Sequence, residues 1–316
     1  MNWLTLENRE NRTDEFFKDV ITGLQAYPKH IPSKYLYDRR GSELFDQICE
    51  LEEYYVTRAE LAIVERHARE MADAIGDDVC LVELGSGSSS KTRYLLRALR
   101  SVAGYIPMDI SADYLFSAAD QLQSEFPELP IHPHVGDFSE NQALPELGKC
   151  ERLVFYFPGS TIGNLCREQS VQLLKRMSAT GQRSGLLIGI DLQKEPEIIN
   201  AAYNDTQGVT AAFSKNLLIR INRELSGNFN TKLFAHVARY DRKTCQVDIG
   251  LQSQVAHRVR VNDYEIQFER GEMIHTETSR KYRIDEFSRL AATAGFRLIS
   301  SWSDPQHYFA VLYLES

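Results

Sequence analysis

The chain has 316 residues, more than a single domain of ordinary size, and a formal net charge of −8 at pH 7. Hydrophobic residues make up 43% and charged residues 25% of it, which is ordinary globular composition and excludes a disordered chain. The negative charge and the scattered basic residues argue against a nucleic-acid partner.

The cysteines and the start of the chain indicate the compartment. Five cysteines lie far apart with no Cys-x-x-Cys pair, which disfavours a disulfide framework or a zinc cluster and fits a reducing environment. The polar start MNWLTLENRENRTDEFF lacks the order of a signal peptide, and no apolar run has the length of a membrane span. We therefore expect a cytoplasmic protein with no membrane partner and no metal.

The first part of the chain is predicted to be helical in pieces. Apolar residues recur at helical spacing over residues 16–24 and again over residues 44–51. Thr57 is predicted to cap a longer helix over residues 58–75, with Glu60 as its capping-box partner.

From residue 79 onward, predicted strands alternate with helices. The strands cover residues 79–84, 104–109, the region near 130–135, 153–157 and 185–191. The helices cover residues 90–99, a stretch begun by Ser111, and residues 167–178. This alternation implies a parallel sheet covered by helices on both faces.

After Asp191 the alternation ends and a second pattern begins. We expect a wholly helical stretch over residues 195–225, followed by several antiparallel strands over residues 231–282. A helix over residues 285–294 and two final strands over residues 296–302 and 308–314 complete the chain's predicted elements. A terminal hairpin that adds one antiparallel strand to a parallel sheet is the expected ending of a class I methyltransferase.

Three predicted strands are followed by residues suited to a nucleoside ligand. The segment ELGSG at residues 83–87 stands where a strand turns into a helix, and its glycines let the backbone approach a ligand. Ser90 replaces the third glycine of the dinucleotide fingerprint, which counts against a pyrophosphate. At the ends of the next two strands, Asp109 can accept ribose hydroxyls, and Asp137 can accept an adenine amino group while Phe138 packs on the ring. A single acid at a strand end is more often a helix cap. The glycine turn and the two acids in this order together favour S-adenosylmethionine over NAD as the ligand.

A second glycine-rich loop, FPGSTIGN at residues 157–164, also follows a strand. It resembles the Gly-x-Ser-x-Gly nucleophile elbow only superficially, because Thr161 takes the place of the serine, and a hydrolase is disfavoured. The loop is expected at the sheet's carboxyl edge, where open α/β sheets bind ligands.

Several segments, most of them outside the cofactor motif, follow the pattern of one family. They are YLYDRRGSELFDQI at residues 35–48, EYYVTR at 53–58, ELGSGSSSKTR at 83–93, FPGSTIGN at 157–164, GVTAAF at 208–213 and TETS at 276–279. In these segments the chain resembles the histidine Nα-methyltransferases of ergothioneine biosynthesis, and the similarity runs from about residue 28 to the end. A related fungal branch methylates a tryptophan derivative, so the resemblance leaves the substrate open.

The resemblance implies a role for each matching residue. Contacts with S-adenosylmethionine are implied for Gly85, Ser86, Lys91, Asp109, Asp137 and Phe138. Contacts with the substrate's α-amine and α-carboxylate are implied for Tyr37, Tyr54, Asn164 and Tyr203. Contacts with the imidazole are implied for Glu277 and Ser279, with Thr210 nearby. Two residues depart from the family pattern. They are Val56 and Ile249, and Ile249 is expected to line the histidine pocket.

Methyl transfer to an amine is an in-line displacement that depends on alignment, with no covalent enzyme intermediate. Tyr37 and Tyr54 are the expected catalytic residues. The phenol of Tyr37 is suited to accept the amine proton, and a passive hydrogen bond is an equal alternative. The ring of Tyr54 is suited to a trimethylammonium group through cation–π attraction. Asn164 offers a donor and an acceptor to a zwitterion, although a turn asparagine is the simpler interpretation.

Glu277 and Ser279 are two residues apart, so on a strand they point to the same face. A carboxylate and a hydroxyl together satisfy the two unlike nitrogens of an imidazole. Tryptophan or phenylalanine would leave the carboxylate unpaired and would be rejected. The alternative is a solvated strand face, which the flanking charged residues Lys281 and Glu272 indicate.

We therefore predict an α/β protein, with a Rossmann-like class I methyltransferase sheet and a second, discontinuous α+β substrate-binding domain. The cofactor-binding domain is expected at 75–195 with 283–316, and the substrate-binding domain at 1–74 with 196–282. The expected activity is methylation of free L-histidine, up to trimethylhistidine (hercynine), by a monomer whose only partner is a small amino acid. Another aromatic amino acid as substrate, and a non-catalytic cofactor-binding module, are the alternatives.

Overall fold

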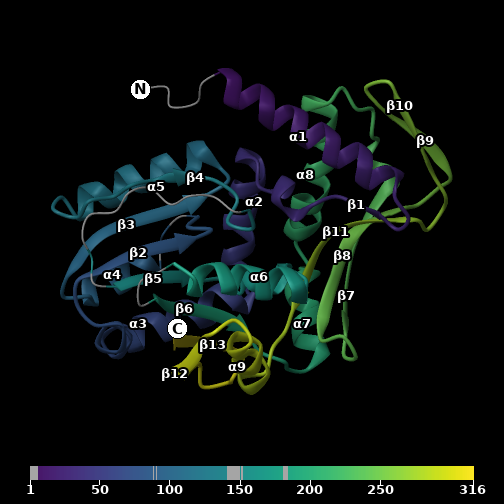
Figure 1. The fold of residues 1–316 in the computed structure, drawn as a ribbon. Helices are drawn as coiled ribbons and strands as arrows, with labels where there is room; N and C mark the ends of the chain where they lie inside the picture. Colours follow the sequence, from purple (N-terminus) through teal and green to yellow (C-terminus); the bar gives the residue numbers. More distant parts are fainter. Residues whose placement is uncertain (1–5, 88, 90, 141–149, 151, 181–183) are drawn as a thin grey trace. The chain divides into compact units, whose positions relative to one another are not determined.

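The computed structural model describes residues 6–87, 89, 91–140, 150, 152–180 and 184–316 (Figure 1). Ser90, where a helix was expected to begin, lies outside these residues. The chain forms two compact units, named here by their largest sheets. The four-stranded unit holds Met1–Glu53, Glu197–Asp241 and Val247–Thr278, and the seven-stranded unit holds Tyr54–Pro196, Arg242–Gln246 and Ser279–Ser316.

The large sheet has the strand order β12-β13-β6-β5-β2-β3-β4. Its strands are β2 (Val79–Leu84), β3 (Val102–Asp109), β4 (His134–Val135), β5 (Arg152–Phe157), β6 (Ser184–Asp191), β12 (Arg297–Ser303) and β13 (Phe309–Glu315). Within this order, the neighbouring strands of the run β6-β5-β2-β3-β4 pair in parallel, whereas β13 is antiparallel to both β6 and β12. The predicted parallel sheet with one antiparallel strand is confirmed. Both β2 and β6 are buried along their whole length, as expected of apolar strands covered on both faces.

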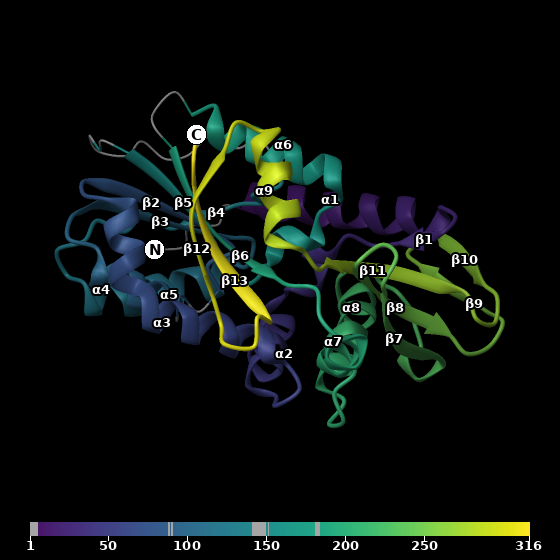
Figure 2. The same cartoon turned by 90° about the horizontal axis from the view of Figure 1, so that it is seen from below.

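Helices cover both faces of this sheet (Figure 2). They are α3 (Tyr55–Ile75), α4 (Thr92–Ala98) and α5 (Ala112–Glu125) on one face, with α6 (Arg167–Ser178) and α9 (Ile284–Ala292) on the other. The apolar core beneath α6 and α9 joins residues of both helices, such as Leu174 and Phe287, to strand residues such as Val82 and Ile188.

Helix α3 differs from its prediction in two ways. It begins at Tyr55 rather than at residue 58, and its N-cap residue Tyr54 makes no side-chain cap hydrogen bond. Thr57 and Glu60 therefore form no capping box. The helix belongs to the seven-stranded unit, whereas the sequence placed residues 1–74 apart from the sheet. The physical reason is its buried apolar stripe, which includes Ile63 and Met71, since the helix packs against β12 and β13.

The four-stranded unit combines helices with a sheet of order β1-β11-β8-β7. Its helices are α1 (Leu6–Gln25), η1 (Ser33–Leu36), α2 (Arg39–Glu50), α7 (Pro196–Tyr203), α8 (Val209–Glu224) and η3 (Thr231–Leu233). Its strands are β1 (Lys29–His30), β7 (Phe234–Asp241), β8 (Gln246–Ser253) and β11 (Met273–Arg280), and β9 (His257–Val261) with β10 (Tyr264–Phe268) forms a separate antiparallel hairpin. The parallel pairing of β1 with β11 was not predicted.

The stretch over residues 195–225 is not wholly helical, because a turn separates α7 from α8. Asp205 accepts hydrogen bonds from the backbone N–H groups of Val209 and Thr210, each at 2.8 Å, and so satisfies the first turn of α8. Gly208 precedes the helix with a φ of +76°, a conformation that favours glycine. In the part of the chain that the structure describes, no helix combines the length and apolarity that a membrane crossing requires.

Candidate functional site

The turn from β2 toward α4 is built for close approach to a ligand. Gly85 and Gly87 have φ values of +69° and +50°, and the amides of Gly85 and Ser86 both donate to the carbonyl of Met108, at 2.9 and 3.1 Å. The Ser86 hydroxyl is buried and has no hydrogen-bond partner among the described residues. A buried hydroxyl without a partner is costly, so this position fits a polar group of a ligand.

Asp109 lies at the end of β3 and holds this turn in place. Its carboxylate accepts from Gly87 N at 3.1 Å and from Ser111 N at 2.9 Å. Burial raises the pKa of Asp109 above its usual range, although these N–H donors oppose the shift. A carboxylate has about four acceptor positions, so these two bonds leave capacity for ribose hydroxyls. Asp109 is not the N-cap of the following helix, since that position is Ser111, and its carboxylate remains suited to its predicted role.

Phe138 and Asp137 follow β4 beside the same turn. The Phe138 ring lies 3.9 Å from the place where a Cβ on Gly85 would stand, and it packs edge-on against Phe157 at 5.1 Å. Asp137 accepts from the amide and the hydroxyl of Ser139, at 2.8 and 2.6 Å. The structure therefore places the Phe138 ring beside the glycine turn, with an acidic residue next to it in the chain, which fits an adenosine group.

Lys91 has a partner that the sequence did not indicate. Its ammonium lies 2.5 Å from the carboxylate of Glu60, which is fully buried and also accepts from Gly159 N at 3.0 and 2.9 Å. A Cβ on Gly189 would stand 2.2 Å from Glu60 Oε1, so this glycine makes space for the carboxylate. Glu60 was predicted as a capping-box partner because it stands three residues after Thr57. Its buried ion pair was not predictable, since Lys91 and Gly159 are far from it in the sequence.

Glu83 is a second buried acid beneath the glycine turn. It accepts from Thr92 Oγ1 at 2.7 Å and from the Tyr105 hydroxyl, which ties β2 to α4 and β3. Burial raises its pKa to about 7, although the bonds from Tyr105 and Thr92 oppose the shift. No role was predicted for Glu83 from the sequence.

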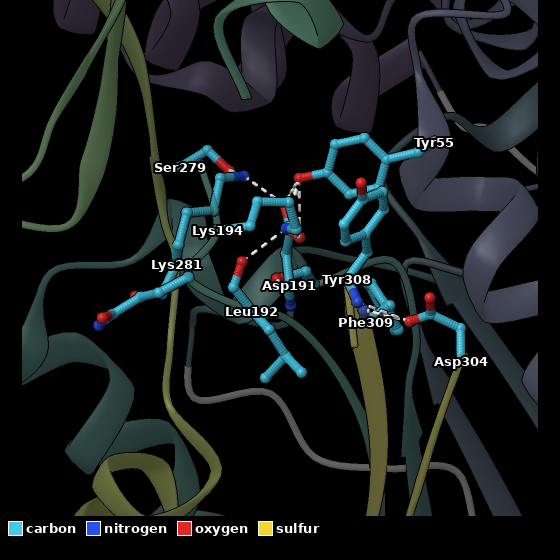
Figure 3. A network of polar contacts seen from close by, with 11 residues as sticks. Tyr55, Asp191, Leu192, Lys194, Ser279, Lys281, Asp304, Tyr308 and Phe309 are labelled. Carbon is cyan, nitrogen blue, oxygen red and sulfur yellow. Dashed lines mark hydrogen bonds and ion pairs between the residues drawn. The ribbon is translucent and has the colours of Figure 1, made fainter. Parts of the chain in front are cut away.

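Asp191, the last residue of β6, collects three partners within the seven-stranded unit (Figure 3). Its carboxylate lies 2.5 Å from Lys194 Nζ and 2.6 Å from Lys281 Nζ, and it accepts from the Tyr55 hydroxyl at 3.0 Å. Burial raises the pKa of Asp191, but the two ammonium groups outweigh it and hold the pKa below its usual range. This cluster, which the sequence did not indicate, stands at the carboxyl edge of the sheet.

Three of the predicted substrate residues, Tyr54, Asn164 and Ser279, belong to the seven-stranded unit. Tyr54 precedes α3 and is buried. Asn164 ends the short helix η2 (Thr161–Asn164), where a Cβ on Gly163 would stand only 2.7 Å from the carbonyl oxygen of Arg280. This close approach brings the turn that carries Asn164 against the end of β11, next to Ser279.

The other four, Tyr37, Tyr203, Thr210 and Glu277, belong to the four-stranded unit. The Tyr37 ring packs edge-on against Phe45 at 5.6 Å and Phe213 at 5.4 Å, and Phe213 lies three residues after Thr210 on α8. Tyr203 is buried at the end of α7. Glu277 is half-buried on β11. Phe45 and Phe213 were not predicted as site residues, although both lie inside segments that resemble the family.

The comparisons with known proteins agree with one another. A family model described as histidine-specific methyltransferase, SAM-dependent, matches residues 16–316. The histidine N-alpha-methyltransferase of Mycobacterium tuberculosis is 42% identical over 294 residues, covering 91% of this chain and 90% of the relative. The enzyme of the same name from Mycolicibacterium smegmatis is 41% identical, covering 93% and 92%. Ergothioneine biosynthesis protein 1 of Neurospora crassa is 31% identical over 89% of this chain, which corresponds to 32% of that longer protein.

Proposed function

The chain belongs to the family of S-adenosylmethionine-dependent, histidine-specific methyltransferases, and we propose that it methylates the α-amine of free L-histidine up to three times. The product is then trimethylhistidine (hercynine), and the reaction is a step of ergothioneine biosynthesis. The observation that carries the proposal is the extent of the family match, which includes both compact units rather than the cofactor turn alone. The similarity to relatives named for histidine methylation and for ergothioneine biosynthesis supports it.

The residues around the glycine turn fit the cofactor. S-adenosylmethionine, when bound, supplies a methyl group activated by a sulfonium. In this proposal Asp109 accepts the ribose hydroxyls, Phe138 packs on the adenine, and Asp137 accepts its amino group. The unpartnered hydroxyl of Ser86 and the positive-φ glycines support this assignment. Lys91, which forms an ion pair with Glu60, is proposed to contact the same cofactor.

For the substrate, we propose that Asn164 binds the two ends of the amino-acid zwitterion, with Tyr54 and Tyr203 beside them. The Tyr37 phenol either accepts the amine proton or makes a passive hydrogen bond. Since the Tyr37 ring packs with two phenylalanines, the aromatic surface there also suits a methylated ammonium through cation–π attraction. Glu277 and Ser279, with Thr210 nearby, are proposed to contact the imidazole.

Mass spectrometry of the purified protein with S-adenosylmethionine and a mixture of free amino acids tests the proposal. We expect histidine to gain three methyl groups. Methylation of tryptophan instead would change the substrate, and cofactor binding without any product would favour a non-catalytic module. The proposal also includes a monomer acting in the cytoplasm, and light scattering on the purified protein tests the oligomeric state.

Replacing Asp109 with alanine should raise the Kd for S-adenosylmethionine by about tenfold or more, because hydrogen bonds to a charged group contribute roughly 1.5–3 kcal/mol. The melting temperature should fall as well, since the amides of Gly87 and Ser111 lose their acceptor. Calorimetric titration measures the affinity, with Asp120→Ala on the exposed side of α5 as the matched control. An unchanged Kd would remove Asp109 from the cofactor site.

Asn164→Ala should weaken histidine binding by about tenfold and leave the affinity for S-adenosylmethionine unchanged, because its amide is proposed to contact the substrate alone. Separate titrations with each ligand provide the comparison. If both affinities fell together, the residue would serve the structure of the turn at Gly163 rather than the substrate.

A further inference from the structure

One fully buried carboxylate contacts both of the segments that follow β2 and β5 in the seven-stranded unit. Glu60, on α3, has a side chain that is 0% exposed, and its Oε2 lies 2.5 Å from the ammonium of Lys91. Both of its oxygens also accept from Gly159 N, at 3.0 and 2.9 Å. Lys91 is the N-cap residue of α4, and Gly159 stands in the loop after β5. A single acid thus holds a cofactor lysine and a neighbouring loop.

The sheet brings these groups together and leaves the lysine accessible. Strands β2 and β5 are neighbours that pair in parallel, so the segments that follow them start from the same edge. A Cβ on Gly159 would stand 4.0 Å from Lys91 Nζ, which places the ammonium against this loop. The Lys91 side chain is 16% exposed, whereas that of Glu60 is closed to solvent. A ligand can therefore reach the lysine but not the carboxylate.

The ion pair separates two effects that an ammonium has on a ligand. Hydrogen bonds act only at contact distance, whereas the Coulomb interaction of an unpaired charge falls with the first power of distance. S-adenosylmethionine carries a carboxylate, which an ammonium attracts, and a sulfonium, which an ammonium repels. A carboxylate 2.5 Å from the ammonium cancels much of the long-range repulsion, while short contacts with Lys91 stay possible.

Glu60 is the acid that supplies this compensation. Its partners are an ammonium and an amide N–H, and both of them require an acceptor. The other buried acid beneath the glycine turn, Glu83, accepts from Thr92 and Tyr105 instead. Burial raises the pKa of Glu83 to about 7, so this acid is partly protonated at neutral pH. The charge of Lys91 is therefore balanced mainly by Glu60.

We infer that Glu60, through its ion pair with Lys91, is a positioning residue that favours S-adenosylmethionine over S-adenosylhomocysteine, the product left after methyl transfer. When the methyl group leaves, the sulfur keeps the electron pair of the broken bond and becomes a neutral thioether. The two ligands therefore differ by one positive charge beside the same lysine. With Glu60 in place that charge meets a neutral pair, and without it the charge meets an unpaired ammonium. The inference rests on the proposed contact of Lys91 with the cofactor.

Calorimetric titration with each of the two ligands tests the inference on wild type, Glu60→Gln, Lys91→Met and the double variant Glu60→Gln/Lys91→Met. Glutamine has the size of glutamate and keeps an oxygen for Gly159 N, so it removes chiefly the charge. We expect Glu60→Gln to raise the Kd for S-adenosylmethionine about tenfold and that for S-adenosylhomocysteine only about twofold. The double variant has the net charge of wild type, so its ratio of the two Kd values should return to within about twofold of the wild-type ratio.

The same helix offers a matched control. Glu65→Gln makes the same chemical change at an exposed position of α3, and it should leave the ratio of the two Kd values within about twofold of wild type. Glu60→Met removes the charge together with the acceptor. It should also weaken S-adenosylmethionine more than S-adenosylhomocysteine, and it serves if the glutamine variant does not fold.

Equal changes of the two Kd values in Glu60→Gln, or none, would overturn the inference, because a disturbed loop alone weakens both ligands alike. So would a double variant that keeps the ratio of Glu60→Gln. These outcomes leave the proposed function standing as long as the wild type methylates histidine. An unchanged Kd for S-adenosylmethionine in Lys91→Met would instead remove this lysine from the proposed cofactor site, and the inference would fail with it.

Discussion

Glu277→Ala should lower kcat/KM for histidine by about one to two decades while the affinity for S-adenosylmethionine stays unchanged. A charge-assisted hydrogen bond from an imidazole N–H to a carboxylate contributes roughly 1.5–3 kcal/mol, which corresponds to that loss. The carboxylate lies half-buried on β11, where solvent weakens such a bond less than it would on an open surface.

The same variant should also discriminate less against tryptophan, because it lacks the charge that an indole ring would leave unpaired. Measuring kcat/KM for both amino acids gives the ratio. Glu272→Ala is the control, since this residue directly precedes β11 and pairs with Lys29 at 2.6 Å. If the ratio for Glu277→Ala equalled that of wild type, specificity would be set elsewhere.

The second large effect concerns pH and Glu83. The pKa of this acid rises from about 4.5 to about 7 on folding, so between these values the folded state holds a proton that the unfolded state releases. The contribution to stability is therefore fully present below pH 4.5 and is lost as the pH rises toward 7. At about 1.4 kcal/mol per pKa unit, the loss amounts to about 3 kcal/mol.

Glu83→Gln removes this titration and keeps an oxygen that accepts from Thr92 or Tyr105. Denaturant unfolding at several pH values between 4.5 and 7.5 should show a free energy of unfolding that falls less steeply for the variant than for wild type. Glu65→Gln, at an exposed position on α3, provides the control for a lost charge. Parallel curves for wild type and Glu83→Gln would mean that Glu83 folds in its charged form.

Local patterns were sufficient to predict the strands of the large sheet and the glycine turn that follows β2. The run VCLVEL at residues 79–84 is β2 without a shift at either end, because a strand buried on both faces is continuously apolar. The acids at strand ends were predictable because parallel strands place their carboxyl ends along one edge. The terminal hairpin followed from alternation and a turn sequence.

The ion pairs were not predictable, because their partners are distant in sequence and the pairing depends on the fold. Glu60 and Gly159 are 99 residues apart, and nothing near Glu60 distinguishes it from a helix-capping acid. Lys281 was interpreted as a sign of a solvated strand face, yet it is among the most buried side chains. The turn at Gly208 was missed because the helical periodicity on both sides of it concealed the break.

Gly189 shows how one position can be constrained by a residue on another element. By pattern it is an ordinary small residue inside the buried strand β6, and alanine would count as a conservative replacement. A single methyl group there would meet Glu60 Oε1 at 2.2 Å and the Phe309 ring at 2.8 Å. Displacing that carboxylate would deprive Lys91 and the amide of Gly159 of their common partner. A library of variants that changes only the loops around the glycine turn would therefore omit Gly189. Yet this position inside β6 determines where the Glu60 carboxylate lies beside those loops.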